Sequence, residues 1–464
     1  MKVHLSAICG TAMASLAGLL RDRGHVVSGS DQDVYPPMST QLEALGIEIR
    51  SPYHADNVPA DADVVVIGNA LSRGNPEVEV VLDRKQRAVS MPALLADELL
   101  RDRTSIVVAG THGKTTTSSL VAFLLDRAGR DPSFLIGGVP QDFGRSYRLS
   151  AGPHFVVEGD EYDCAFFDKR PKFVHYLPDV AVVGNVEFDH ADIYPDLAAV
   201  ETAFGRLLSV LPRRGRLIAG IESPAVARLV PSSPAPVDTF GLAEGARFRA
   251  VDLRTGPGGT AFRLLVDGTD HGAFTMPLAG EHNVRNALAA LAAVGAVGVA
   301  PEEVREALSA FRGVKRRLEL RGVVRGVSVY DDFAHHPTAV RATLQALRAL
   351  VPADGRLLAV FEPRSYTSRT RVFQADFAAA LAEADAVVIA AAHLPGKVPA
   401  GERLSEVEMV AGIDAAGGRA SFVPDVPAIV AHVAAAARSG DVVAILSNGG
   451  FGGIHDRLLD ALHP

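Results

Sequence analysis

The stretch Val108-Ala109-Gly110-Thr111-His112-Gly113-Lys114-Thr115-Thr116-Thr117 decides the fold of this chain. The apolar run Ser105–Val108 leads into it as a predicted buried strand, and Thr116–Arg127 follows as a predicted helix. Backbone N–H groups of a glycine turn between a strand and a helix, together with the helix N-terminus, bind phosphate. The stretch therefore predicts an α/β fold with a parallel sheet and a nucleotide phosphate site.

Two side chains in this stretch have distinct expected roles. Lys114 can reach the β- and γ-phosphates of ATP, and the Thr115 hydroxyl can coordinate Mg²⁺. The general phosphate-loop pattern has glycine where Val108 stands, so an ordinary strand-to-helix turn with a surface lysine is the competing interpretation. The other residues expected around the phosphates are Gly110, Thr111, His112, Gly113 and Thr116.

Acidic residues follow two further predicted strands. Glu158 comes directly after the strand Phe155–Val157, and the segment Asn185–His190 follows the strand Val180–Val183. Because ligands gather at the carboxyl ends of parallel strands, both groups should converge on the phosphate loop. Carboxylate and phosphate oxygens together suit Mg²⁺. The alternative is a set of solvated acids on surface loops.

The N-terminal segment suits a diphosphate better than a dinucleotide. Gly10 follows the predicted strand Val3–Ile8 and precedes a predicted helix. A dinucleotide fingerprint needs G-x-G-x-x-G, but Ala12 and Ser15 stand at its second and third glycine positions. The helix N-terminus still favours a diphosphate, and Asp31 closes the second strand, where an acid often holds a ribose hydroxyl. A plain strand-to-helix turn is the alternative.

Two later segments carry candidate nucleotide contacts. Gly280–Asn286 opens a predicted helix, where histidine and asparagine can cap the helix or contact a base. Arg316 and Arg317 precede the turn Asp331–Pro337, and paired arginines beside such a turn suit phosphate. The residues singled out in these segments are His282, Asn283, Asn286, Arg317, Asp332 and His335.

Strand-like and helix-like runs alternate in three successive blocks. The central block also contains a Gly-rich, hairpin-like stretch, Val237–Pro277. The predicted fold is α/β with three consecutive domains: a Rossmann-like domain at 1–102, a P-loop ATPase-like domain at 103–312 and a Rossmann-like domain at 313–464. The first block is predicted to contain Val3–Ile8, Met13–Arg23, His25–Ser30, Pro37–Leu45 and Val64–Ile67.

Composition excludes several classes of protein. The net charge of −8 over 464 residues argues against a nucleic-acid or anionic-membrane partner. Cys9 and Cys164 do not make a disulfide framework, and free thiols fit a reducing cytoplasm. Polar residues interrupt the N-terminal apolar stretch, which argues against a signal peptide, and the sequence contains no apolar run long enough to span a membrane.

Taken together, these motifs resemble those of the Mur ligases of peptidoglycan synthesis, and the resemblance runs from end to end. The matching segments are G-T-A-M at 10–13, G-T-H-G-K-T-T at 110–116, E-G-D-E at 158–161, N-V-E-F-D-H at 185–190, G-E-H-N-V-R-N at 280–286, R-R-L-E at 316–319 and D-D-F-A-H-H-P at 331–337.

The resemblance implies that the first domain binds UDP-N-acetylmuramate, the central domain binds ATP, and the third domain brings the amine substrate. Lys114 would bind the phosphates, and Thr115, Glu158 and His190 would hold Mg²⁺. His335 would face the reaction centre and complete a catalytic set with Lys114, Glu158 and His190. The residues implied to bind substrate are Gly10, Thr11, Met13, Asp31, Asn69, Arg364 and Asn448.

Within the family, the chain resembles the recycling branch that adds the tripeptide L-Ala-γ-D-Glu-meso-diaminopimelate. That likeness rests on Asp33–Ser39, Gly68–Ala70 with Arg73–Pro76, Glu161–Arg170, Lys172–Tyr176 and Ser447–His455. Most branches carry a carbamylated lysine in the central domain, whereas Phe204 stands near that position here. The L-alanine-adding branch also lacks this lysine.

Competing functions are the L-alanine-adding ligase, a P-loop kinase or regulatory ATPase, and a nicotinamide dehydrogenase. The segment F-E-P-R-S-Y at 361–366 departs from the L-alanine-adding pattern, which resembles F-Q-P-H-R-Y, and Phe333 replaces its tyrosine. A kinase would leave the first and third domains unexplained. Ala12 and Ser15 disfavour a dehydrogenase. The preferred hypothesis is an ATP-dependent ligase that adds the tripeptide through an acyl phosphate.

Overall fold

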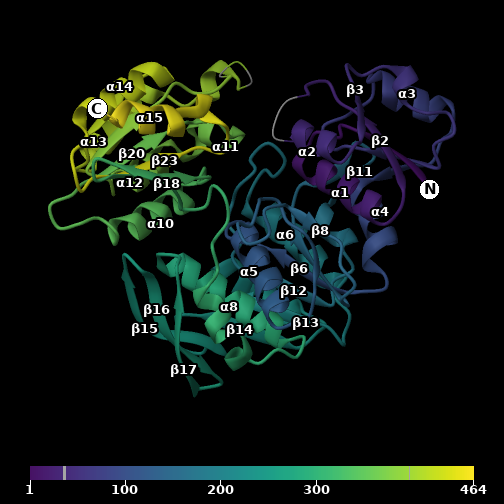
Figure 1. The fold of residues 1–464 in the computed structure, drawn as a ribbon, viewed down its shortest axis with the longest axis horizontal. Helices are drawn as coiled ribbons and strands as arrows, with labels where there is room; N and C mark the ends of the chain where they lie inside the picture. The colour runs from purple at the N-terminus through teal and green to yellow at the C-terminus, as the bar shows by residue number, and fades with distance from the viewer. Residues whose placement is uncertain (35–37, 395, 397, 464) are drawn as a thin grey trace.

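The computed structural model describes residues 1–34, 38–394, 396 and 398–463, so Tyr35–Pro37 of the segment Asp33–Ser39 lie outside it. The chain forms three α/β units in series, which confirms the predicted fold class. In Figure 1 the purple first unit and the yellow third unit both lie above the teal central unit. Among the described residues, no helix combines the length and apolarity needed to cross a membrane.

The first unit is built on a parallel sheet with strand order β3-β2-β1-β4-β5. Strand β1 ends at Ser6 rather than at the predicted Ile8, because Ala7 takes a positive φ of 70° and starts the turn. The elements are β1 Lys2–Ser6, α1 Thr11–Asp22, β2 Val26–Ser30, α2 Met38–Ala44, β3 Glu48–Arg50, β4 Val64–Ile67, α3 Pro76–Asp83, β5 Ala88–Ser90 and α4 Met91–Leu95.

The central unit has a long sheet with strand order β17-β16-β15-β14-β13-β12-β6-β9-β7-β8. The strands β14 to β9 run parallel, and the hairpin-like stretch forms an antiparallel extension, β15 to β17. The elements are β6 Thr104–Ala109, α5 Lys114–Arg127, β7 Ser133–Leu135, β8 Tyr147–Arg148, β9 His154–Gly159, β10 Asp163–Ala165, β11 Asp168–Pro171, β12 Val180–Val183, α6 Leu197–Ser209, β13 Arg216–Gly220, α7 Pro224–Leu229, β14 Val237–Gly241, β15 Phe248–Gly256, β16 Gly259–Val266, β17 Thr269–Met276, α8 Glu281–Gly295 and α9 Arg305–Ser309.

The third unit has strand order β18-β19-β23-β20-β21-β22, with an antiparallel edge pair β18–β19 and parallel strands beyond it. The buried apolar runs that make β20 and β23 are typical of strands covered on both faces. The elements are β18 Glu319–Val324, β19 Val327–Asp332, α10 Pro337–Arg348, β20 Leu357–Phe361, α11 Tyr366–Arg369, α12 Gln374–Leu381, β21 Ala386–Ile389, α13 Glu406–Ala415, β22 Ala420–Phe422, α14 Val426–Ala436, β23 Val442–Leu446 and α15 Ile454–Leu462.

One hydrophobic cluster spans the first and central units, each of which also has a further cluster, whereas the third unit has clusters of its own. Helix α1 packs on β8 so closely that a Cβ at Gly18 would lie 2.1 Å from the Tyr147 ring. The same core continues into α6, where Phe204 is fully buried against Phe173 at a ring-centroid distance of 5.3 Å. The third unit is built around separate clusters and contacts the central unit through hydrogen bonds near its α10 and through Phe373 against Phe188.

Candidate active site

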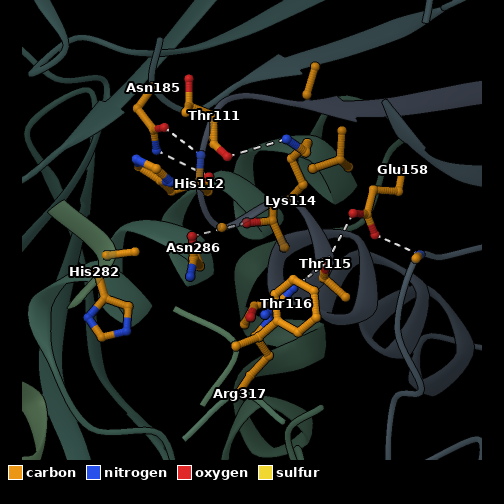
Figure 2. A pocket seen from close by; sticks show the side chains of 18 of the residues that line it. Thr111, His112, Lys114, Thr115, Thr116, Glu158, Asn185, His282, Asn286 and Arg317 are labelled. Atoms are coloured by element: carbon orange, nitrogen blue, oxygen red, sulfur yellow. Dashed lines mark hydrogen bonds between the residues drawn. The ribbon is translucent and has the colours of Figure 1, made fainter. Parts of the chain in front are cut away.

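A cavity of about 800 Å³ lies where the carboxyl ends of the central strands face the third unit. Figure 2 shows side chains from both units turned into it. Most of the candidate residues line this cavity, which brings together segments far apart in sequence, from Thr111 to Asn448. They are Thr111, His112, Gly113, Lys114, Thr115, Thr116, Glu158, His190, His282, Asn283, Asn286, Arg317, Asp332, His335 and Asn448.

The phosphate loop is held in shape by glycine conformation and by the neighbouring loop. Gly113 has φ 80°, and a Cβ there would lie 2.4 Å from Asn286 Oδ1, so only glycine fits. The N–H of His112 donates to Asn185 Oδ1 over 2.8 Å, and that of Thr111 donates to Asn185 O over 2.9 Å. Helix α5 starts at Lys114, two residues before the predicted Thr116, which places its N-terminus at the loop.

Lys114 is held by a buried carboxylate that we had not singled out. Its Nζ donates to Gly110 O over 2.7 Å and lies 2.9 and 3.0 Å from the two Glu161 oxygens. Burial alone would lower the pKa of Lys114, but the carboxylates around it outweigh burial and raise it. Glu161 is 2 % exposed and also lies 2.9 Å from His190 Nε2. Glu161 therefore links Lys114 to His190.

Thr115 and Glu158 meet at the first turn of α5, as Figure 2 shows. The Thr115 hydroxyl donates to Glu158 Oε1 over 3.0 Å, and the Gly137 N–H donates to Glu158 Oε2 over 2.7 Å. Burial raises the pKa of Glu158 despite nearby Lys114. A hydroxyl and a desolvated carboxylate offer the oxygen donors that a hard cation bound to phosphate needs, so Thr115 and Glu158 fit Mg²⁺. His190 has both ring nitrogens engaged, with Glu161 at 2.9 Å and Tyr162 at 2.7 Å, and would have to release one of them to join the ion.

The start of α8 forms the opposite wall of the cavity. Asn286 accepts from the Thr117 hydroxyl over 3.2 Å and donates to Asn283 Oδ1 over 3.2 Å, so both amides are fixed in orientation. Burial lowers the pKa of His282 to about 4, which keeps its ring neutral. An ion pair that we had not predicted, Arg285 to Glu222 at 2.7 Å, closes this wall. These groups suit a nucleoside.

The third unit contributes a cation and a neutral histidine. Arg317 lies over the Phe333 ring at 4.4 Å, and its Nη2 reaches Thr115 Oγ1 over 3.3 Å. Asp332 accepts the Leu318 N–H over 2.7 Å and shapes the turn between them. Burial lowers the pKa of His335 to about 4, and Asp189 opposes this only partly. The His335 ring is therefore unprotonated at neutral pH, and its Nδ1 lies 3.0 Å from the Phe333 carbonyl oxygen.

The residues expected to bind substrate outside the central unit differ in their exposure and in their contacts. Gly10, Thr11 and Asn69 are exposed, whereas Met13 is buried in the core beside Ala12, which does reach the cavity. Asp31 accepts the Cys9 N–H over 2.8 Å and the Tyr53 hydroxyl over 3.0 Å. Arg364 lies against Gly449, the residue that follows Asn448. A Cβ at position 449 would come within 1.9 Å of the Arg364 Nε.

Glu161 was not among the predicted site residues, because the sequence does not show which acidic residue of the segment 158–161 contacts which partner. Its neighbour Asp160 pairs instead with Lys172 over 2.6 Å, so the segment 158–161 sends its carboxylates to three different partners. Burial would raise the pKa of Glu161, but Lys114 and His190 outweigh burial and lower it. Only the long-range pairing with Lys114 distinguishes this residue.

We expect Glu161→Gln to lower turnover by about tenfold or more, because Lys114 and His190 would lose the charge that orients both. The nucleotide should still bind, since its wall contacts stay intact. Steady-state kinetics against Mg²⁺ concentration checks this, because a positioning role also predicts a higher Mg²⁺ requirement. Asp163→Asn, which removes a partly buried carboxylate paired with the exposed Lys169, is the matched control. Unchanged Mg²⁺ dependence in Glu161→Gln would contradict the assignment.

Comparison with known proteins gives consistent matches over the whole chain. Family models match at 2–103 (Mur ligase family, catalytic domain), 108–294 (Mur ligase middle domain) and 316–449 (Mur ligase, glutamate ligase domain). The chain is 45% identical to the Escherichia coli UDP-N-acetylmuramate–L-alanyl-γ-D-glutamyl-meso-2,6-diaminoheptandioate ligase, covering 100% of this chain and 98% of that protein.

Two further comparisons distinguish the branches. The chain is 37% identical to a UDP-N-acetylmuramate–L-alanine ligase of Acidovorax, over 99% of this chain and 96% of that protein. Among solved structures, a murein peptide ligase from Psychrobacter arcticus matches with a TM-score of 0.73 and 38% identity, covering 100% of this chain and 98% of that chain. The tripeptide-ligase relative is therefore closer in sequence than the L-alanine-ligase relative.

Proposed function

Because the chain belongs to the Mur ligase family, we propose that it is an ATP-dependent ligase that joins L-Ala-γ-D-Glu-meso-diaminopimelate to UDP-N-acetylmuramate. The observation that carries the tripeptide assignment is the end-to-end similarity to the Escherichia coli ligase, at 45% identity. Such an enzyme would return a murein peptide to peptidoglycan synthesis. Its nucleotide-linked substrate and ATP favour a place in the cytoplasm.

We assign one substrate to each domain. Residues 1–102 would hold the UDP-sugar through Gly10, Thr11, Met13, Asp31 and Asn69, residues 103–312 would hold ATP, and residues 313–464 would hold the peptide. Ala12 supports this arrangement, because it places the start of α1 at the same cavity as the phosphate loop. The lactyl end of the sugar can then lie between α1 and Lys114.

The phosphate loop and the third unit would neutralise the triphosphate from two sides. The N-terminus of α5, with the Lys114 ammonium, would face it from the central unit, and Arg317, which reaches Thr115 Oγ1, would face it from the third. Thr115, Glu158 and His190 would hold Mg²⁺, which would supply further positive charge to the phosphate oxygens. His282, Asn283, Asn286 and Asp332 would line the rest of the nucleotide.

The proposed chemistry has two steps. The lactyl carboxylate attacks the γ-phosphorus, which gives an acyl phosphate and releases ADP. The peptide amine then attacks the activated carbonyl carbon, and phosphate leaves from the tetrahedral intermediate. Lys114 and Arg317 stabilise the charge on the transferred group, and His335, neutral at working pH, can take the proton lost by the amine.

Isotope transfer tests the acyl-phosphate step. With ¹⁸O in the lactyl carboxylate, one labelled oxygen should appear in the released phosphate, because the carboxylate oxygen that attacks phosphorus leaves with it. Mass spectrometry of the phosphate after a full turnover measures the transfer. A reaction in water enriched in ¹⁸O with unlabelled sugar is the control for exchange with solvent. Label that remains wholly in the amide product would exclude the intermediate.

A further inference from the structure

Three side chains from distant segments meet where the central and third units touch. His112 belongs to the phosphate loop, Glu187 follows β12, and His336 caps α10. His112 Nε2 lies 3.2 Å from Glu187 Oε2, and His336 Nδ1 lies 3.6 Å from the same oxygen. The two imidazole rings lie 4.7 Å apart between centroids. Their three potential ligand atoms all lie within 4.8 Å of one another.

The tautomer of His336 leaves a lone pair directed at a carboxylate. Its Nε2 lies 3.2 Å from Phe188 O, to which it donates, and its Nδ1 accepts the Thr338 N–H over 3.3 Å. Nδ1 therefore carries no proton and faces Glu187 as a second acceptor. Burial, with a smaller contribution from His112, lowers the pKa of His336 to about 4, which preserves this neutral form. His336 Nδ1 and Glu187 Oε2, which accepts the Thr338 hydroxyl over 2.7 Å, are thus both acceptors, and they lie 3.6 Å apart.

From this geometry we infer that His112, Glu187 and His336 bind a divalent transition-metal ion such as Zn²⁺. A tetrahedral ion with Zn–N and Zn–O bonds of roughly 2.0–2.1 Å separates its ligand atoms by about 3.3 Å. The separations of 3.2 and 3.6 Å at Glu187 Oε2 lie on either side of that value. The bond from His336 Nε2 to a backbone carbonyl is the support that metal-bound imidazoles usually have.

This site differs from the proposed Mg²⁺ site in both residues and chemistry. None of its three side chains belongs to the set Thr115, Glu158 and His190. Two imidazoles and one carboxylate suit Zn²⁺, Co²⁺ or Ni²⁺, whereas Mg²⁺ prefers oxygen ligands. Because Glu187 is on the central unit and His336 on the third, a bound ion would hold the two units together.

A second cluster among the described residues provides a comparison. Cys164, Asp168 and His175 also place ligand atoms within 4.8 Å of one another. There, however, Asp168 already accepts two hydrogen bonds from the Arg170 guanidinium at 2.9 and 2.8 Å. Burial raises the pKa of the Cys164 thiol to about 12, so it stays protonated. An ion would have to displace both an arginine and a proton, and we assign no site here.

Zinc titration of the full chain tests the inference without ATP, sugar or peptide, so its outcome is independent of the proposed function. We expect calorimetry in millimolar Mg²⁺ to show a Zn²⁺ site whose Kd rises at least about tenfold in His336→Gln and in Glu187→Gln. Glu187→Gln keeps an acceptor for the Thr338 hydroxyl, 2.7 Å away, and so preserves the contact between units. His175→Gln should bind as the wild type does.

Two spectroscopic and thermal measurements complete the test. Co²⁺ should give the visible absorption of a four-coordinate ion in the wild type and lose it in both variants. Zn²⁺ should raise the Tm of the wild type more than that of His336→Gln, because the bound ion stabilises the folded state. Identical Zn²⁺ affinity and identical Co²⁺ spectra in wild type, His336→Gln and Glu187→Gln would overturn the inference and leave Glu187 as a hydrogen-bonding contact alone.

Discussion

Replacing Lys114 with alanine should lower kcat by about 10²–10³, which corresponds to about 3–4 kcal/mol of lost transition-state stabilisation. Lys114 is the cation that the phosphate loop directs at the transferred group, and Glu161 fixes its Nζ at 2.9 Å. The loss should fall on kcat, because the charge that Lys114 neutralises develops during phosphoryl transfer. Glu158→Gln should show an effect of similar size through the loss of the Mg²⁺ ligand.

A control variant and thermal unfolding measurements distinguish a loss of catalysis in Lys114→Ala from a loss of folded protein. Lys169 is also paired with a carboxylate, but its side chain is 68% exposed and lies on β11 away from the loop. Lys169→Ala should therefore keep nearly full turnover. Removing Lys114 leaves Glu161 buried with only His190 as its charged partner, so thermal unfolding of each variant should accompany the kinetics. A folded Lys114→Ala enzyme with more than a tenth of wild-type turnover would remove the phosphate-loop assignment.

The second large effect concerns the choice of amine. We expect kcat/KM for the tripeptide to exceed that for L-alanine by at least about 10², which is ~2.7 kcal/mol of differential transition-state binding. The tripeptide carries three carboxylates, and Arg364 can pair with one of them. Arg364 is partly exposed and lies beside Asn448, whose side chain reaches the cavity. Assays with both amines on one enzyme preparation measure the ratio.

Replacing Arg364 tests whether this residue causes the preference for the tripeptide over L-alanine. Arg364→Ala should lower kcat/KM for the tripeptide and leave UDP-N-acetylmuramate affinity nearly unchanged, since the sugar would bind in the first domain. Arg371→Ala is the matched control, because Arg371 lies on the same unit and pairs with Glu408 at the surface. Equal or better use of L-alanine by the wild type would reassign the chain to the L-alanine-adding branch.

Some elements could be predicted from their own stretch of sequence alone. Two apolar runs, Val64–Ile67 and Val180–Val183, are strands with the predicted bounds. Each is a short, mainly β-branched run bounded by polar or turn residues, a pattern that favours a strand covered on both faces. The glycine turn between β6 and α5 was also predicted, because its glycines and the apolar run before it lie within ten residues, although α5 starts two residues earlier than expected.

Several short strands and helix α6 were not predicted from the sequence. β3, β7 and β22 have three residues each, too few for a periodic pattern, and they form only because a neighbouring strand is already in place. Helix α6 was missed although it buries Phe204, because its apolar residues follow an irregular loop. These elements depend on partners that the local sequence does not contain.

The sequence alone determined which residue types the site contains, because strand ends, glycine turns and helix starts are local features that place their side chains at one sheet edge. Only the tertiary structure decided which of those residues meet. Glu161 rather than Asp160 holds Lys114, and Glu187 joins His112 to His336, which stands 224 positions further along the chain. Such choices depend on contacts between segments far apart in sequence, and no short-range pattern encodes the distance between two such side chains.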